Sequence, residues 1–210
     1  MSDLAILALD ASNFVLALLL VTLGLVIIFG LMNVINMAHG ELFLLGAYTV
    51  YAVQRAGGHY WLALLLTPVV LGAIGWLLEE LVIRHVYHRF IDTILATWGL
   101  SIAIKQGVVL AFGPTAQQVD NPLPGTIEIL GAAYPAYRLF VMAAAIAASA
   151  GVFLLFYRTD WGLMARAVIA NRPMARNLGI DTRRMDRRTF ALGAALAGLA
   201  GAVMAPLMSV

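Results

Sequence analysis

The densest group of polar side chains inside an apolar stretch lies between residues 33 and 41. Four members could contact a solute through amide, imidazole or carboxylate groups: Asn33, Asn36, His39 and Glu41. Asn33, Asn36 and Gly40 are spaced i, i+3, i+7 and would share one face of a helix. Gly40 and the earlier Gly30 could each interrupt that helix, and a helix break inside a membrane is tolerated where it lines a cavity. A wet, tight turn between two helices explains the same residues, so both interpretations stay open.

A second set of polar side chains lies in the apolar stretch 91–112. Trp98, Ser101 and Lys105 follow i, i+3, i+7 spacing and would share a helix face. Trp98 could equally pack in a core, and Lys105 could extend to the membrane surface. The candidate solute path is completed from this stretch by Thr97, Trp98, Ser101 and Gln106.

Covalent chemistry has little support in the sequence. The protein has no cysteine, which excludes disulfides and thiolate metal sites. Its only lysine, Lys105, lies outside any glycine-rich phosphate loop. An acid–base pair inside the apolar stretches could come only from His39 and Glu41. We therefore predict a protein that is not an enzyme, with no catalytic residue, metal site or cofactor; any ATP that drives it is hydrolysed by another subunit.

The composition places most of the chain in lipid. It is 62% apolar and 11% charged, with a mean hydropathy of +0.92, whereas soluble domains are about 25% charged. A crossing helix needs about 20 apolar residues, and the chain offers such stretches at 12–32, 35–54, 60–83, 91–112, 137–157 and 188–208. The predicted fold is all-α, a polytopic membrane bundle of about six helices in a single domain over residues 1–210. Nucleic-acid binding is not expected, because it needs a basic soluble domain.

Basic residues orient the predicted bundle. Eight of the thirteen lie in the loop 158–188, and Arg84 and Arg89 follow the third apolar stretch. Because basic loops stay on the cytoplasmic side, both loops are predicted to lie there. The loop 113–137, rich in proline and glycine, and the N-terminus are then predicted to lie outside.

The loop 158–188 encodes a short helix of its own. Asn171 can cap its start, Pro173 suits its first turn, and Gly179 can end it. The helix would be about two turns long, with Met174 and Leu178 on one face. It could lie on lipid headgroups or in the groove of a partner protein, and the residues alone do not separate these two.

The last apolar stretch carries small residues at a spacing of four: Gly193, Ala197 and Gly201. This spacing lets helix backbones approach closely in lipid. The contact could be packing within the chain or a subunit interface. Because the chain ends at Val210, just after this stretch, we expect the complete subunit to continue further.

Four segments together resemble the membrane subunits of ATP-driven importers of the branched-chain amino acid type: 33–41 (NVINMAHGE), 96–101 (ATWGLS), 171–180 (NRPMARNLGI) and 189–201 (TFALGAALAGLAG). The last three resemble the urea-importing branch more than the amino acid branch. The resemblance implies a multi-pass permease of a prokaryotic cytoplasmic membrane. Its expected partners are a second permease subunit, cytoplasmic ATP-binding subunits and an extracytoplasmic substrate-binding protein. Members of this family continue with further helices beyond the point where this chain ends.

The resemblance also implies roles for the two loops. Residues 160–180 would dock on the ATPase, and residues 113–137 would face the binding protein. The candidate coupling residues are Gly162, Arg166, Asn171, Arg172, Pro173, Met174, Arg176, Leu178 and Gly179.

The substrate is argued from the polar groups in the apolar stretches. Urea is uncharged, so its path would need amide or carboxylate oxygens and an aromatic face. A zwitterionic amino acid would favour a matched charge for each of its ends. The fixed charges are only Glu41 and Lys105, which favours urea or a short amide. A branched-chain amino acid importer is the alternative, and a passive channel that needs no ATPase is a third interpretation.

Overall fold

The computed structural model describes residues 2–87, 90–129 and 132–208; Arg89, one of the predicted orienting residues, lies outside them. This part of the chain forms α1 (Ser2–Met32), α2 (His39–Arg55), α3 (Tyr60–Leu81), η1 (Ile83–His85), α4 (Phe90–Phe112), β1 (Thr126–Ile129), β2 (Ala132–Pro135), α5 (Ala136–Arg158), α6 (Asp160–Ala170), α7 (Arg172–Asn177), α8 (Thr182–Met204) and η2 (Ala205–Leu207). The predicted all-α fold is confirmed, apart from the hairpin of β1 and β2.

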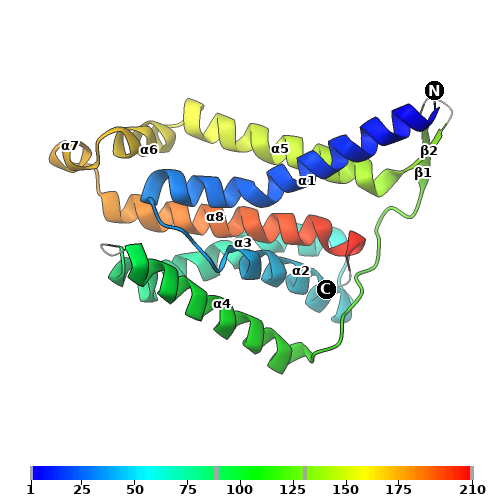
Figure 1. The fold of residues 1–210 in the computed structure, drawn as a ribbon, viewed down its shortest axis with the longest axis horizontal. Coiled ribbons are helices and arrows are strands. Elements are labelled where there is room, and N and C mark those ends of the chain that lie inside the picture. Colours follow the sequence, from blue (N-terminus) through cyan, green and yellow to red (C-terminus); the bar gives the residue numbers. More distant parts are fainter. Residues whose placement is uncertain (1, 88–89, 130–131, 209–210) are drawn as a thin grey trace.

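Helix α8 is the centre of the bundle. It packs against α1, α2 and α3, and Figure 1 shows it running through the middle of the molecule with these helices around it. Helix α5 lies along α1, whereas α4 touches the rest of the bundle mainly through α2 and η1. The elements that contact α8 directly are therefore the ones that fix the interior of this chain.

Glycines allow α8 to approach its neighbours at backbone distance. A Cβ placed on Gly46 of α2 would lie 2.1 Å from the carbonyl oxygen of Gly198, and one placed on Gly193 would lie 2.9 Å from that of Gly24 in α1. Ordinary helix pairs are held 8–10 Å apart by their side chains. These crossings therefore require residues without a side chain.

Five helices within the described residues are long and apolar enough to cross a membrane: Ile6–Met32, Tyr60–His85, Phe90–Phe112, Ala136–Arg158 and Thr182–Leu207. The sixth predicted crossing, 35–54, corresponds to α2. Its predicted start was wrong, because residues 33–38 are not helical and α2 has only 17 residues from His39 onward. It begins about halfway along α8 (Figure 1).

Two elements were not predicted from the sequence. Helix α6 fills the first part of the loop 158–188 and is capped by Thr159, whose side chain accepts a hydrogen bond from the Gly162 N–H at 3.1 Å. The hairpin of β1 and β2 lies within the loop 113–137, with Thr126 opposite Pro135. Both segments are more ordered than their composition indicates.

The two described basic segments lie at the same end of the bundle, which we call the arginine-rich end. Arg84 from η1 and Arg172 from α7 line one pocket there. The hairpin lies at the opposite end (Figure 1). The buried Tyr60, at the start of α3, and the buried Tyr137, at the start of α5, form a pair. The hydroxyls of Tyr60 and Tyr137 are 2.8 Å apart, and that of Tyr137 lies 2.7 Å from the carbonyl oxygen of Val203. The hairpin end is thus joined to the end of α8.

Candidate functional site

Residues 33–38 form a non-helical link that turns back into the bundle. The link starts at Asn33, which has a positive φ of 54°, a conformation that asparagine adopts more readily than most residues. It ends where His39 Nε2 lies 2.9 Å from the carbonyl oxygen of Val21. Val21 is about three turns before the end of α1 at Met32, so the chain has returned to the middle of α1. Helix α2 consequently begins deep inside a span.

The backbone of this link finds its hydrogen bonds within the protein. The Met37 N–H donates to Thr97 Oγ1 at 3.2 Å, and the Ala38 N–H donates to Asn36 Oδ1 at 3.1 Å. Non-helical backbone at membrane depth is stable only when it is satisfied in this way or lines a wet cavity. Thr97, fully buried in α4, is therefore what ties α4 to the link.

Two buried side-chain nitrogens at the start of α2 have no hydrogen-bond partner among the described residues. They are Nδ2 of Asn36, a side chain only 3% exposed, and Nδ1 of His39, only 7% exposed. Buried polar atoms are nearly always paired with protein or water, so each exception needs an explanation. A solute or a water held at the link would supply the missing partner.

The other candidate residues lie differently. Asn33 and Gly40 are exposed and Asn36 is buried, so the helical face expected for these three does not exist, because the segment is not helical. On α4, Trp98 is 55% exposed, Gln106 is exposed and Ser101 is half-buried, as is Glu41 on α2. Of the eight residues predicted for the path, the structure brings Asn36, His39 and Thr97 together at the link.

The small-residue row of α8 passes directly behind the link. A Cβ on Gly24 would meet the carbonyl oxygen of Gly193 at 2.3 Å and the ring of His39 at 3.1 Å. Gly201 lies against the backbone of Phe43 in α2, and Ala197 is buried beside Leu42. The row of Gly193, Ala197 and Gly201 thus faces α1 and α2 of the same chain. A displacement of α8 would therefore change the packing around His39.

At the arginine-rich end, α6 is held tightly against the end of α5. A Cβ on Gly162 would lie 2.2 Å from the carbonyl oxygen of Phe156. The Arg166 guanidinium donates to the same oxygen at 2.5 Å and lies 4.9 Å from the centre of the Tyr157 ring. Gly162 and Arg166 therefore fix the angle between α5 and α6.

The predicted short helix exists as α7. The Asn171 side chain accepts a hydrogen bond from the Met174 N–H at 3.0 Å, Pro173 occupies the first turn, and Gly179 follows with a φ of 87°. Met174 and Leu178 are 56% and 76% exposed. They give α7 and the residue after it a largely exposed apolar face, and Arg176 is exposed as well.

Arg172 behaves differently from the other residues of α7. Its guanidinium is paired with Asp186 of α8, a carboxylate only 2% exposed, whose second oxygen, Oδ1, has no partner among the described residues. The sequence did not single out Asp186. The available signal was a single acidic residue among the arginines of 183–188, four residues before the apolar stretch that starts at Phe190.

The end of α3 adds a second set of ion pairs. Glu80 accepts from Arg84 and from Arg187, the latter at 2.8 Å. Glu79, only 1% exposed, accepts a hydrogen bond from the Tyr87 hydroxyl. Burial and the neighbouring Glu79 raise the pKa of Tyr87, so this hydroxyl keeps its proton at neutral pH. These contacts join α3, η1 and α8 at the arginine-rich end.

The sequence was compared with known proteins and families. Residues 7–210 match the family model described as the permease component of the branched-chain amino acid transport system. The chain belongs to this family. The helix break deep in a span and the short helices α6 and α7 at the arginine-rich end are thus parts of a permease.

Similar proteins include the high-affinity branched-chain amino acid transport system permease protein LivH of Salmonella typhimurium, 26% identical over 88% of this chain and 65% of that protein. BraD of Pseudomonas aeruginosa, which carries the same description, is 24% identical over 88% and 65%. A probable branched-chain amino acid transport permease protein LivH of Methanocaldococcus jannaschii is 27% identical over 89% and 62%. The chain therefore spans a little under two thirds of the length of these permeases. No solved structure matches it.

Proposed function

We propose that this permease is the membrane-spanning subunit of an ATP-driven, binding-protein-dependent importer that carries branched-chain amino acids into the cell. The observation that supports this most directly is the link 33–38, which places two unpartnered polar groups at the start of a helix in the middle of a span. Discontinuous helices of this kind form substrate sites in other transporters. The importer would lie in the cytoplasmic membrane, with the arginine-rich end inside and the N-terminus outside.

The start of α2 suits the two charged ends of an amino acid. No side chain caps the helix. The His39 N–H already donates to the Asn36 carbonyl oxygen at 3.3 Å, so the N–H groups that follow it and the positive end of the helix dipole would receive a carboxylate. A Cβ on Gly40 would meet nothing within 4 Å, which leaves room for a solute to approach the backbone. Glu41 in the same first turn offers a carboxylate to the ammonium group. Two charges of the substrate would thus be met within one turn.

The partners follow from the same proposal. A second permease subunit would complete the pathway, and cytoplasmic ATP-binding subunits would contact the exposed face of α7 at Met174 and Leu178. The loop 113–137 would face an extracytoplasmic binding protein. ATP-driven closure would move α6 and α7, and through them α8, whose Gly193 lies against Gly24 of α1, beside the ring of His39.

Urea remains a second candidate substrate. Nδ2 of Asn36 and Nδ1 of His39, which have no partner among the described residues, belong to an amide and an imidazole. Both groups suit a neutral solute as well as a charged one. The names of the relatives point instead to branched-chain amino acids, and the accessible start of α2 adds a site for a carboxylate. We therefore place the amino acid first.

Uptake measurements on the full assembly separate these candidates. Accumulation of radiolabelled leucine is expected to require ATP and to be suppressed by excess unlabelled isoleucine, but not by urea or acetamide at the same concentration. Accumulation of labelled urea that leucine does not suppress would contradict the amino acid assignment. Uptake that continues without ATP would identify a passive channel.

The Asn36→Asp variant tests the link itself. The new carboxylate can still accept from the Ala38 N–H, as Asn36 Oδ1 does at 3.1 Å, so assembly should survive. It replaces the unpartnered Nδ2 with a negative oxygen that repels a substrate carboxylate. We expect leucine uptake to fall by at least about tenfold, since opposed like charges cost several kcal/mol.

The matched control is Asn33→Asp, at the exposed start of the same link. Asparagine and aspartate both tolerate a positive φ, so this variant should transport normally. Normal leucine uptake by Asn36→Asp would remove the link from the path. Urea uptake that rises in Asn36→Asp would favour urea, because the carboxylate offers its N–H groups another acceptor.

A further inference from the structure

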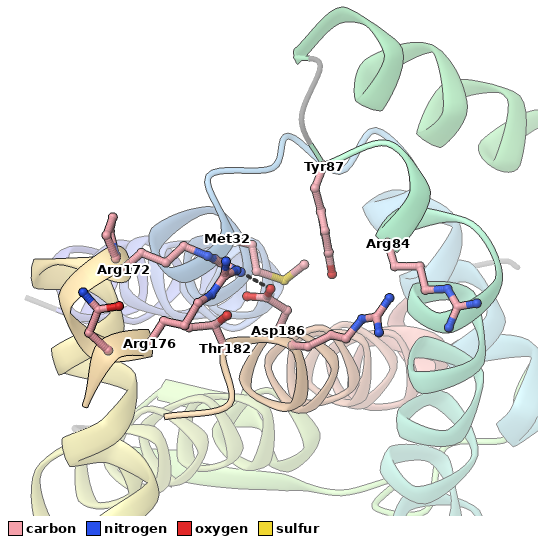
Figure 2. A pocket seen from close by; sticks show the side chains of 10 residues that line it. Met32, Arg84, Tyr87, Arg172, Arg176, Thr182 and Asp186 are labelled. Atoms are coloured by element: carbon pink, nitrogen blue, oxygen red, sulfur yellow. Dashed lines mark hydrogen bonds and ion pairs between the residues drawn. The ribbon is translucent and has the colours of Figure 1, made fainter. Parts of the chain in front are cut away.

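A pocket at the arginine-rich end has a basic lining, part of which the transport proposal does not use. It has a volume of about 750 Å³ and is lined by residues from α1, η1, α7 and α8, with four arginines among them: Arg84, Arg172, Arg176 and Arg183. Figure 2 shows Arg172 and Arg176 extending over it from α7, and Tyr87 reaching in from the other side.

The charges of the four arginines are only half neutralised. Arg172 is paired with Asp186, and Arg84 with Glu80. Arg176 and Arg183 are exposed, and among the described residues neither guanidinium group has a close ion pair, although Arg176 attracts the Asp186 carboxylate at longer range. Two guanidinium groups without a direct partner at the mouth of one concave site favour an anion. Arginine binds phosphate with particular geometric fit, because its planar fork can donate two parallel hydrogen bonds.

The pocket lies at the depth of lipid headgroups. Met32 is the last residue of one span, Arg84 lies near the end of the next, and Thr182 is the first residue of a third. Beyond these residues on the membrane side the surface is apolar: Phe29 and Leu81, each about one turn away in sequence, are 46% and 62% exposed. A molecule with an anionic head and apolar chains would match this change from basic to apolar surface.

A docked protein fits this pocket less well than a lipid. The α7 residues that line it are Arg172, Pro173, Arg176 and Asn177. The exposed apolar residues Met174 and Leu178 are not among them, so they occupy a different face of α7. An ATPase that contacts Met174 and Leu178 would leave the pocket between α7 and the span ends unfilled.

We propose that this pocket binds the phosphate of an anionic phospholipid headgroup, which Arg176 and Arg183 contact at the membrane surface. Basic pockets between transmembrane helices on the cytoplasmic side bind anionic headgroups in other proteins. A lipid bound here would hold α7 against α1, η1 and α8. The inference needs the arginine-rich end to lie at a membrane surface, but it does not depend on which solute is transported.

The test uses the full-length protein with Arg176→Gln and Arg183→Gln combined. The matched control combines Arg158→Gln and Arg188→Gln, two exposed arginines of the same loop that do not line the pocket. Both double variants lose the same charge. Phosphatidylglycerol retained after purification in detergent is measured by native mass spectrometry, and affinity by titration into nanodiscs of increasing phosphatidylglycerol content.

The wild type and the control are expected to retain phosphatidylglycerol. The pocket variant is expected to bind it about thirtyfold more weakly, because each of the two lost arginines contributes about tenfold or somewhat less to binding at the membrane surface. Phosphatidylglycerol, but not phosphatidylcholine, should raise the melting temperature of the wild type. Equal loss in the control would show a general charge effect and overturn the pocket. The proposal would also be overturned if inorganic phosphate raised the melting temperature as much as the lipid does. It would be overturned too if the pocket variant no longer bound the ATPase but retained the lipid as the wild type does. Because lipid retention needs no transport, its failure is distinguishable from failure of the proposed function.

Discussion

Replacing Gly201 with alanine is expected to lower the stability of this protein more than any other glycine-to-alanine substitution in the described residues. The new Cβ would lie 1.9 Å from the carbonyl oxygen of Phe43 and 3.1 Å from the Ala47 nitrogen. Both are backbone atoms of α2, so no rotamer change can relieve the clash. Because α8 packs on α1, α2 and α3 at once, α2 would have to separate from α8.

We expect the free energy of unfolding to fall by at least about 2 kcal/mol, which lies towards the upper part of the range for overpacked cores. It is measured as a lower apparent melting temperature of the detergent-solubilised protein, followed by fluorescence-detected size-exclusion chromatography. Gly46→Ala should behave in the same way, since its Cβ would lie 2.1 Å from the Gly198 oxygen.

The control is Gly99→Ala on α4, where a Cβ would meet nothing within 4 Å. Alanine has the higher helix propensity, so this variant should be as stable as the wild type or slightly more so. If Gly201→Ala and Gly99→Ala have the same melting temperature, the close crossing of α2 and α8 does not stabilise the bundle.

The helices of this bundle were largely predictable, because each must supply about 20 apolar residues between polar turns. The cap at Asn171 and the stop at Gly179 predicted α7 for an equally local reason. The exact start of α2 was not predictable. The two asparagines of residues 33–38 indicated a possible break or turn, but the non-helical path that these residues follow depends on Thr97, about sixty positions away in the sequence.

Spacing also misplaced part of the site. On α4 it grouped Trp98 with Ser101 and Lys105, yet the contact with the link is made by Thr97, one position away. Periodicity defines a face of a helix but not what that face meets. The same limit applies to Arg172, which belongs to a basic loop in sequence but pairs with a buried acid. These differences arise wherever a tertiary contact, rather than a local pattern, decides the position of a side chain.

Breaking the Arg172–Asp186 pair is expected to uncouple ATP hydrolysis from transport in the proposed importer. Arg172 is the first residue of α7, and Asp186 is buried in α8. Two turns further along α8, Gly193 touches Gly24 beside the ring of His39. The pair therefore connects the helix proposed to meet the ATPase with the helix that backs the link.

In Arg172→Gln, the Asp186 carboxylate loses its ion-pair partner while it remains buried. Removing one partner of a buried pair costs about 3–5 kcal/mol; the lower figure applies here, because the Arg172 side chain is 37% exposed. We expect leucine uptake to fall at least about tenfold, while binding-protein-stimulated ATP hydrolysis continues. The measurement is the ratio of leucine transported to ATP hydrolysed in proteoliposomes.

Two further variants separate coupling from general damage. Exchanging the charges, with Arg172→Asp and Asp186→Arg together, restores an ion pair and should recover much of the ratio. Arg184→Gln removes an exposed pair with Asp181, whose two side chains are 71% and 52% exposed; such pairs contribute at most about 1 kcal/mol, so its ratio should be normal. If Arg172→Gln loses uptake and ATP hydrolysis in equal proportion, and the exchange restores neither, the pair only stabilises the fold. A recovered ratio in the exchanged protein would mean instead that α7 and α8 move as one body. The wild type and the exchanged protein share the attraction between positions 172 and 186, whereas the sign of the charge at each position differs.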